Sequence, residues 1–492
     1  MSVRARSFSI TLDHVWLAAA FALLLVRPLL TPIQPFDFWW HMATGRLIVG
    51  TGQIPIVDTF SYTQAGQPFF NQSWLAQVGM YGLYQVGGLP LIVLIQAVVI
   101  ALAYGLLLWV IWLHVERLRL AVGVLLLVAM PLSFDNWSIR PQSYAFPLFA
   151  AMLAILTADR AGRRAPLWGL PLLMALWVNI HGSFVLGLAL IGMHSAGRFL
   201  ALFRPSLLAT WEQPRPLIPL IGWGIATAAV TLLNPRGIEV IGYVRNLLGS
   251  SQVTTLVTEW APPNLRDFGG VAFFVVLIGG LLLMAYMRRP PAITDLLLLC
   301  AFTWLALGAV RNIVWFGFVM PPLIAYALAA SSPRTQQQSQ GSTALNGILI
   351  GLLIVLVGLA TPWVKPRLFP PEVGAIVEQE TPIEAVAFLQ QQEPRPERLF
   401  HPLSYGSYLI WAAPDQPVFI DPRIELYPYP QWADLLTLND GSDVQKLLDR
   451  YQFDALLLSR QEQRPLIEAL SNDPTWQERY RDQVSVYMVR VR

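Results

Sequence analysis

Long apolar runs recur along most of this chain, and they constrain its fold more than any other feature. A helix needs about 17–25 mostly apolar residues to cross the hydrocarbon core of a bilayer. The run at 120–133 is short and needs flanking residues to span. The first run leads into further runs and has no small-residue cleavage site, so we do not expect a cleaved signal peptide. Eleven segments are predicted to span: 13–32, 89–113, 120–133, 143–158, 166–180, 183–199, 217–233, 269–287, 293–309, 313–330 and 344–363.

The composition supports a membrane-embedded chain. Of the 492 residues, 55% are hydrophobic and only 13% are charged, against roughly 25% charged in ordinary globular proteins. So few charges would not cover the surface of a water-soluble protein of this size. Composition therefore excludes a cytosolic enzyme, a disordered chain and a nucleic-acid binder, and predicts an α-helical polytopic membrane protein. The single cysteine, Cys300, excludes an intramolecular disulfide.

The charges divide the chain into two parts. Residues 372–492 carry 19 acidic and 11 basic side chains, a balance of −8, although the whole chain has a net charge of +3. Residues 1–371 are correspondingly basic as well as apolar. We therefore predict a transmembrane domain over 1–371 and a soluble α/β domain over 372–492.

The distribution of arginine predicts the orientation. If the N-terminus is cytoplasmic, the inner segments hold 13 basic residues in 62 positions, whereas the outer segments of residues 1–371 hold 8 in about twice that length. The positive-inside rule favours this arrangement, and eleven crossings then place the C-terminal domain outside the cytoplasm. The inner basic residues are Arg4, Arg6, Arg117, Arg119, Arg160, Arg163, Arg164, Arg198, Arg204, Arg215, Arg288, Arg289 and Arg334.

The first outer loop, 33–88, is too long to be a simple connection. Residues 38–50 fit an interfacial helix, with Trp39 and Trp40 at headgroup depth. Asp37 and His41 are four positions apart and would share one helical face. Ser73-Trp74 begins a second amphipathic helix.

The other outer loops are short but rich in polar groups, whereas the inner loops offer little beyond arginine. Gathering acids, arginines, histidines and aromatic residues at one membrane face is what a reaction at that face requires. The candidate residues of these loops are Asp135, Arg140, Asn179, His181, Arg236, Glu259 and Arg311.

Each of these residues also has a purely structural explanation. Asp37 fits a helix cap, and His41 fits a packed or hydrogen-bonded core residue. Asp135 and Arg140 fit a loop ion pair. Asn179 and His181 fit the end of a helix, Arg236 a headgroup anchor, and the tryptophans an aromatic belt. These explanations stay open on the sequence alone.

The sequence resembles the GT-C superfamily of membrane glycosyltransferases. Asp37, in Phe36-Asp37-Phe38-Trp39-Trp40-His41, matches the acidic position after the first span of that family, and Asp135 matches a second acid in the second outer loop. The chain also resembles uncharacterised bacterial multi-pass proteins that share Asp-x-Trp-Trp-His and Asn-x-His-Gly motifs. It lacks the Trp-Trp-Asp-Tyr-Gly motif, which disfavours transfer to protein asparagine. This resemblance implies a multi-pass protein of the bacterial inner membrane.

The resemblance also implies an activity, namely sugar transfer from a polyprenyl-phosphate donor to a glycan, lipid or protein acceptor at the extracytoplasmic face. Such transfer needs a base for the acceptor hydroxyl and positive charge for the departing phosphate. We assign Asp37 as the base, with Asp135 and His41 as catalytic partners. Asp37 and Asp135 are also candidate ligands of a divalent cofactor, Mg²⁺ or Mn²⁺. The candidate substrate-binding residues are Arg140, Arg236, Arg311, Asn179, His181, Trp39, Trp40 and Glu259.

The C-terminal part alternates short apolar and helical patterns, which predicts a small α/β domain. Strands are expected at 398–400, 418–420, 455–458 and 484–491, and helices at 382–392, 431–438, 443–451 and 464–470. Tyr405 to Tyr408 and Asp421-Pro422-Arg423 are expected at strand ends or in loops.

Two other functions remain open on the sequence. A transporter or lipid flippase would want charged or broken helices near the midplane, and only Arg27 lies near that depth. A non-catalytic assembly protein would account for the C-terminal domain but not for the acids of the outer loops.

Overall fold

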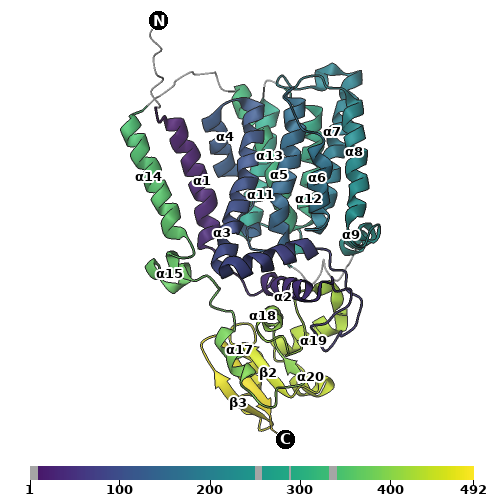
Figure 1. The fold of residues 1–492 in the computed structure, drawn as a ribbon, viewed down its shortest axis with the longest axis vertical. Coiled ribbons are helices and arrows are strands. Elements are labelled where there is room, and N and C mark those ends of the chain that lie inside the picture. Colours follow the sequence, from purple (N-terminus) through teal and green to yellow (C-terminus); the bar gives the residue numbers. More distant parts are fainter. Residues whose placement is uncertain (1–8, 250–257, 288–289, 332–340, 492) are drawn as a thin grey trace.

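A helical bundle with a smaller C-terminal region at one end makes up the computed structural model, which describes residues 9–249, 258–287, 290–331 and 341–491 (Figure 1). The bundle helices run roughly parallel or antiparallel to one another (Figure 1). They are α1 (Leu12–Leu30), α3 (Trp74–Val115), α4 (Leu118–Val124), α5 (Pro141–Arg160), α6 (Gly169–Trp177), α7 (Val185–Phe203), α8 (Leu217–Val230), α11 (Phe268–Tyr286), α12 (Ile293–Gly308), α13 (Ile313–Ser331) and α14 (Thr343–Ala360).

Each of the eleven predicted segments overlaps one of these helices. Within the described residues, seven helices are long and apolar enough to cross a membrane. Leu118–Ala129, Leu217–Leu233 and Ile293–Gly308 are apolar but shorter, and α6 has only nine residues. The protein is therefore a helical polytopic membrane protein. Five of the inner basic residues, Arg4, Arg6, Arg288, Arg289 and Arg334, lie outside the described residues.

Aromatic side chains fill the centre of the bundle. The Phe149 ring of α5 lies 5.1 Å from Trp315 and 5.5 Å from Phe318 of α13, and 6.2 Å from Trp177 of α6. All four side chains are buried. Large rings that pack at these distances contribute both apolar burial and favourable ring contacts. They hold together helices that come from distant parts of the sequence.

The helix that the sequence predicts over 38–50 is present. This helix, α2 (Asp37–Thr51), lies at the end of the bundle next to the C-terminal region (Figure 1). The second predicted helix begins at Trp74 as α3, whose 42 residues exceed what a bilayer needs. Non-helical backbone angles at Gly87 and Gly88 break α3 into two parts. Its first part lies beside α2 and its second part enters the bundle (Figure 1).

Close backbone contact fixes α2 against the first part of α3. A Cβ atom on Gly45 would lie 2.2 Å from the carbonyl oxygen of Gln77, so only glycine fits at this position. The side chain of Gln77 is 3.0 Å from His41 Nδ1 and also accepts a hydrogen bond from Asn71 at 2.8 Å. These contacts fix the rotation of α2 and thereby the direction of Asp37 and His41.

The C-terminal region is built around a mixed four-stranded sheet. The strand order is β1-β2-β4-β3, with β1 parallel to β2 and the other pairs antiparallel. Every residue of β2 is buried. The elements are α15 (Lys365–Leu368), α16 (Pro371–Gly374), α17 (Ile383–Gln390), β1 (Leu399–Phe400), α18 (Leu403–Ala412), α19 (Tyr429–Asn439), α20 (Val444–Tyr451), β2 (Ala455–Ser459), α21 (Arg464–Leu470), β3 (Trp476–Arg481) and β4 (Ser485–Arg490).

The structure differs from the sequence-based expectation at three places in this region. Residues 403–412 form the helix α18 rather than a loop, because this segment packs against α2. The segment 418–420 is not a strand of the sheet, since Val418 instead forms a single bridge with Ser61 of the first outer loop. The strand β3 was not expected, because its outward side chains are mostly charged or polar. Tertiary contacts decide all three cases.

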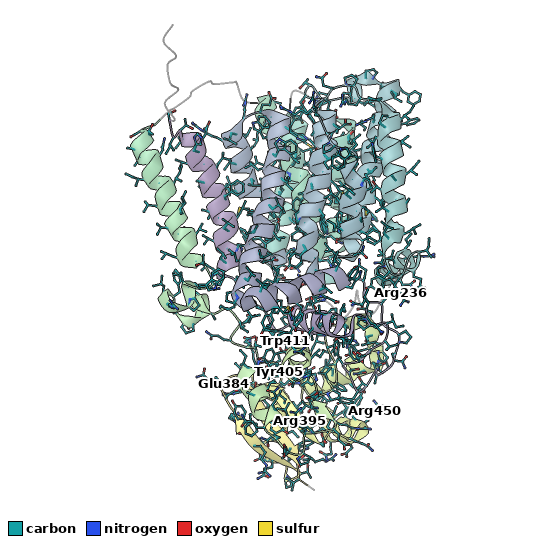
Figure 2. All side chains as sticks on the ribbon, viewed as in Figure 1. Arg236, Glu384, Arg395, Tyr405, Trp411 and Arg450 are labelled. Atoms are coloured by element: carbon teal, nitrogen blue, oxygen red, sulfur yellow. The ribbon has the colours of Figure 1, made fainter. Side chains whose placement is uncertain are left out.

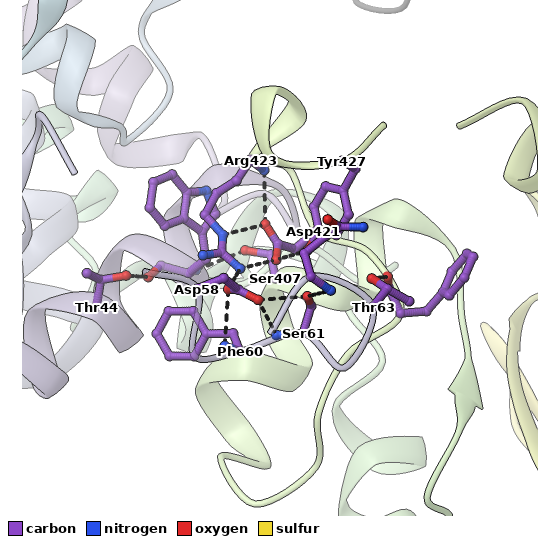
Figure 3. A network of polar contacts seen from close by, with 12 residues as sticks. Thr44, Asp58, Phe60, Ser61, Thr63, Ser407, Asp421, Arg423 and Tyr427 are labelled. Carbon is purple, nitrogen blue, oxygen red and sulfur yellow. Dashed lines mark hydrogen bonds and ion pairs between the residues drawn. The ribbon is translucent and has the colours of Figure 1, made fainter. Parts of the chain in front are cut away.

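A buried ion cluster joins the first outer loop to the C-terminal region (Figure 3). The Arg423 guanidinium lies 2.6 Å from an oxygen of Asp58 and 2.6 Å from an oxygen of Asp421. Tyr427 Oη donates to Asp421 at 2.5 Å, and Ser61 Oγ donates to Asp58 at 2.7 Å. The side chains of Arg423, Asp58 and Asp421 are 2%, 0% and 0% exposed. We call these five residues the Arg423 cluster.

Candidate functional site

A cavity of about 500 Å³ lies where α2, the ends of several bundle helices and the C-terminal region meet. Its lining includes the start of α2, the segments 69–73 and 138–142, the turn 258–260 and part of the C-terminal region. Six of the sequence-predicted residues with ionisable side chains line it: Asp37, His41, Arg140, His181, Glu259 and Arg311. Trp40 lines it as well. The bundle, the first outer loop and the C-terminal region thus share one cavity.

Arg140 stands between two carboxylates in this cavity. Its Nη1 atom donates to both oxygens of Glu259, at 2.9 Å and 3.0 Å, and lies 3.7 Å from Asp37 Oδ2. Arg140 immediately precedes α5, and Asp37 is the first residue of α2. The Asp37 side chain is 33% exposed and lines the cavity. A carboxylate beside a cation is thereby presented to the cavity.

The two carboxyl groups have different proton affinities. Burial raises the pKa of Asp37, and the nearby Arg140 only partly opposes this effect. Burial acts in the same direction on Glu259, but Arg140 and Arg311 outweigh it, so the pKa of Glu259 is lowered. Glu259 is thus the fixed anionic partner of Arg140. Asp37 is the carboxylate better suited to accept a proton near working pH.

Arg311 supplies a second positive charge. Its guanidinium donates to Gln142 at 3.2 Å and lies 4.6 Å from the centre of the Trp260 ring. Within the described parts of the chain, no carboxylate lies within 4.0 Å of Arg311 in an ion pair. A cation that hydrogen bonds to a neutral amide and stacks on a ring keeps donors for an anionic ligand.

The two histidines of the cavity are neutral at physiological pH. Burial lowers the pKa of His181 to about 3, with Arg311 and Arg140 acting in the same direction, and burial also lowers the pKa of His41. His181 Nδ1 accepts a hydrogen bond from the Ser183 backbone N–H at 3.1 Å, which leaves Nε2 as the N–H donor of the ring. His181 therefore offers a neutral donor to the cavity.

Asp135 is not among the residues that line this cavity, and its expected pairing with Asp37 stays a prediction. Asp135 lies in a short turn whose charged neighbours are Arg27 of α1 and Asp267, just before α11. Its Oδ2 atom lies against Gly269 of α11. Asp37 instead has Arg140 and Glu259 as its charged neighbours. The order of the loops in the sequence could not show that Glu259, and not Asp135, is the acid close to Asp37.

Four other predicted residues have structural contacts. Asn179 accepts a hydrogen bond from Trp74 Nε1 at 2.9 Å, outside the lining of the cavity. Arg236 pairs with Glu239 at 2.7 Å on the surface (Figure 2). Trp39 and Trp40 are buried under the C-terminal region rather than exposed to headgroups.

The described residues show no assembled site for the predicted divalent cation. Among them, no three His, Cys, Asp or Glu side chains come together as metal ligands. Asp135 does not line the cavity, and the Arg140 guanidinium lies close to both Asp37 and Glu259. The positive charge that the described residues supply to this cavity comes from arginine.

Among the cavity residues that the sequence did not predict, Tyr243, Glu425 and Trp432 stand out by their chemistry. Tyr243 of α9 (Glu239–Gly249) stacks on Phe70, with ring centres 4.5 Å apart. Glu425 and Trp432 come from the C-terminal region. Glu425 and Trp432 lie two and nine residues after Arg423, and the sequence gives no other signal that they line the cavity. They reach it because the C-terminal region folds onto α2.

Comparison with known proteins finds no match to any protein-family model or to any curated protein sequence. Solved structures do match. The oligosaccharyltransferase of Archaeoglobus fulgidus, tethered to an acceptor peptide, aligns with 97% of this chain and 74% of its own, with a TM-score of 0.58 and 13% identity. ArnT from Cupriavidus metallidurans bound to undecaprenyl phosphate aligns with 97% of this chain and 98% of its own, with a TM-score of 0.52 and 12% identity.

The arabinofuranosyltransferase AftD from Mycobacteria aligns with 98% of this chain and 42% of its own, with a TM-score of 0.53 and 14% identity. These three neighbours are GT-C membrane glycosyltransferases, so this chain has a GT-C-like fold. The resemblance inferred from the sequence is confirmed for the fold. At such low identity, the likeness carries no information about substrate.

Proposed function

We propose that this chain is a membrane glycosyltransferase that moves a sugar from a polyprenyl-phosphate donor to an acceptor hydroxyl. The observation that carries the proposal is the cavity. In it, Asp37, whose pKa is raised by burial, lies beside Arg140 and near Arg311, which forms no ion pair among the described residues. The fold agrees with this function, since its solved neighbours include a glycosyltransferase bound to undecaprenyl phosphate.

The proposed step balances charge within the cavity. The acceptor oxygen bonds to the anomeric carbon of the sugar, its proton passes to Asp37, and the bond from that carbon to the phosphate oxygen breaks. The departing polyprenyl phosphate gains one negative charge. Arg311 and Arg140 stabilise that charge, and His181 donates a neutral hydrogen bond. Preorganised cations in a partly buried cavity act most strongly on charge that develops during the reaction.

The finer topology belongs to the same proposal. We propose that α4, α6, α8 and α12 also cross the membrane, because they run alongside the longer helices in Figure 1. Eleven crossings then put the N-terminus and the C-terminal region on opposite sides. The inner arginines favour a cytoplasmic N-terminus in a bacterial inner membrane, with the cavity facing the extracytoplasmic side.

The test is transfer of radiolabelled sugars from undecaprenyl-phosphate donors in membranes that contain the expressed protein. Asp37→Asn keeps the volume of the side chain but cannot act as a base, so we expect transfer to fall by about 10²–10⁴-fold. Asp415→Asn is the matched control, because Asp415 is exposed in the C-terminal region and lies outside the cavity lining.

The proposal is contradicted if Asp37→Asn transfers sugar as fast as Asp415→Asn at equal expression. It also fails if the unaltered protein consumes no donor across a panel of sugars. The second result would favour the non-catalytic assembly protein over the enzyme.

A further inference from the structure

Glu425 differs from the other carboxylates of the cavity. Asp37 and Glu259 both lie close to Arg140, whereas no basic side chain in the described parts of the chain forms an ion pair with Glu425. Its Oε1 atom accepts a hydrogen bond from Tyr243 Oη at 3.3 Å. A carboxylate offers about four lone-pair positions. Tyr243 and a backbone N–H use only some of these positions, so acceptor capacity remains on Glu425 for a ligand in the cavity.

The groups around Glu425 provide flat apolar faces and hydrogen-bond donors. Tyr243 is held in place by its stacking on Phe70, at an interplanar angle of 10°, and both residues line the cavity. Trp432 also lines the cavity, and its buried Nε1 atom has no hydrogen-bond partner. This part of the cavity thus combines an acceptor carboxylate, a phenol and an indole N–H with aromatic rings.

These groups match the chemistry of a saccharide. Sugar hydroxyls both donate and accept hydrogen bonds, so they can donate to the Glu425 carboxylate and to the Tyr243 oxygen and accept from the indole N–H. The C–H faces of sugar rings are apolar and pack on aromatic rings. An ionised Glu425 repels a phosphate group, whereas Arg140 and Arg311 attract one.

The Arg423 cluster holds this part of the cavity in position. Glu425 lies two residues after Arg423, whose guanidinium is fixed by Asp58 and Asp421. The guanidinium also lies 5.2 Å from the Phe60 ring centre and 5.0 Å from that of Phe69. A binding group on such a buried anchor is preorganised, which reduces the entropy cost of binding.

We propose that Glu425 and Tyr243 form the acceptor subsite and that the acceptor is a saccharide, bound through its hydroxyl groups. This inference rests on the proposed glycosyl transfer, because the acceptor must reach the donor within the same cavity. It assigns the donor to the side of Arg140 and Arg311, and the acceptor to the wall supplied by α9 and the C-terminal region.

The test measures saccharide and lipid binding separately on the full-length protein in nanodiscs. Saturation-transfer NMR uses maltotriose, mannotriose and chitotriose as saccharide probes, with a neutral tripeptide of similar size for comparison. A second titration uses undecaprenyl phosphate. The variants are Glu425→Gln and Tyr243→Phe, and the control is Glu384→Gln, which removes an equal charge from the exposed surface of α17 (Figure 2).

We expect at least one trisaccharide to bind better than the tripeptide. Glu425→Gln should weaken that binding by about 10-fold or more, and Tyr243→Phe by roughly 2- to 10-fold, because each removes a hydrogen-bonding group. Both variants should bind undecaprenyl phosphate as the unaltered protein does, and Glu384→Gln should change neither titration.

The saccharide inference is overturned if no trisaccharide binds, if the tripeptide binds better, or if Glu425→Gln affects binding no more than Glu384→Gln. Failure of the unaltered protein to bind undecaprenyl phosphate would instead refute the proposed function. The two failures are distinguishable because they appear in different titrations.

Discussion

Replacing Arg423 by alanine should open the contact between the first outer loop and the C-terminal region. The substitution removes the cation that lies 2.6 Å from both Asp58 and Asp421, and both carboxylates are fully buried. Breaking a buried ion pair by removing one partner costs about 3–5 kcal/mol, because a charge is left buried without compensation. Here two carboxylates lose their cation, so we expect a cost at the upper end of this range.

Hydrogen exchange at the interface measures this cost. The Tyr62 N–H donates to the Val418 carbonyl at 3.1 Å, and the Val418 N–H donates to the Phe60 carbonyl at 3.0 Å. These amides exchange when the interface opens locally. Since each 1.4 kcal/mol corresponds to a factor of ten, a cost at the upper end of this range should speed their exchange by roughly 10³–10⁴-fold. Amides inside α20 should keep their exchange rates.

A matched control and a compensated variant make this test decisive. Arg450 pairs with Asp434 on the surface at 2.9 Å, so Arg450→Ala should cost only about 0–1 kcal/mol (Figure 2). Combining Arg423→Met with Asp58→Asn and Asp421→Asn removes all the buried charges and should recover most of the lost protection. The reasoning is refuted if Arg423→Ala speeds exchange of Tyr62 and Val418 no more than Arg450→Ala does.

Three further predictions concern the cavity and α2. Burial raises the pKa of Asp37, and Asp37 must be ionised to act as a base, so the rate of transfer should fall on acidification at a pH above the ordinary pKa range of aspartate. A pH–rate profile without this decline would contradict the role of Asp37 as the base. Arg311→Gln should weaken undecaprenyl phosphate binding by about 10-fold or more, measured by titration in nanodiscs against Arg395→Gln, whose arginine is exposed outside the cavity lining. Gly45→Ala should destabilise the protein by about 1–3 kcal/mol or more, because its Cβ would overlap the Gln77 carbonyl, whereas Gly50→Ala on the same helix meets nothing within 4 Å and should not; equal thermal unfolding midpoints would contradict this packing.

The membrane bundle could be predicted from the sequence because apolar length is a local property. Each of the eleven predicted segments is helical, and both helices expected in the first outer loop are present, beginning at Asp37 and at Trp74. Several bundle helices are shorter than expected, because helix ends depend on capping and packing that composition does not encode.

The grouping of the cavity residues could be predicted only in part. Asp37 and Arg140 were candidates because they lie in loops rich in polar and aromatic residues, but Arg140 pairs with Glu259, which is 119 residues away. Asp135 matched a second acid by its order in the chain, yet its neighbours are Arg27 and Asp267. Pairings between loops depend on how the helices pack, and a single sequence carries no record of that packing.

The C-terminal region was the least predictable part. Its sheet was partly expected, but the role of Arg423 as a buried partner of Asp58 joins two segments from opposite ends of the chain. Gly406 illustrates the difficulty, since its Cβ would lie 2.0 Å from the Ile420 carbonyl oxygen. This glycine lies inside a helix because of close packing, although a glycine in sequence more often suggests a turn.

An experimental structure of the protein in nanodiscs with undecaprenyl phosphate tests the central claim most directly. We predict that the phosphate lies in the cavity, with its oxygens about 3 Å from the guanidinium of Arg311 or Arg140. The account is contradicted if the phosphate binds outside the cavity, for example beside Arg27, while Arg140 and Arg311 contact no part of the lipid.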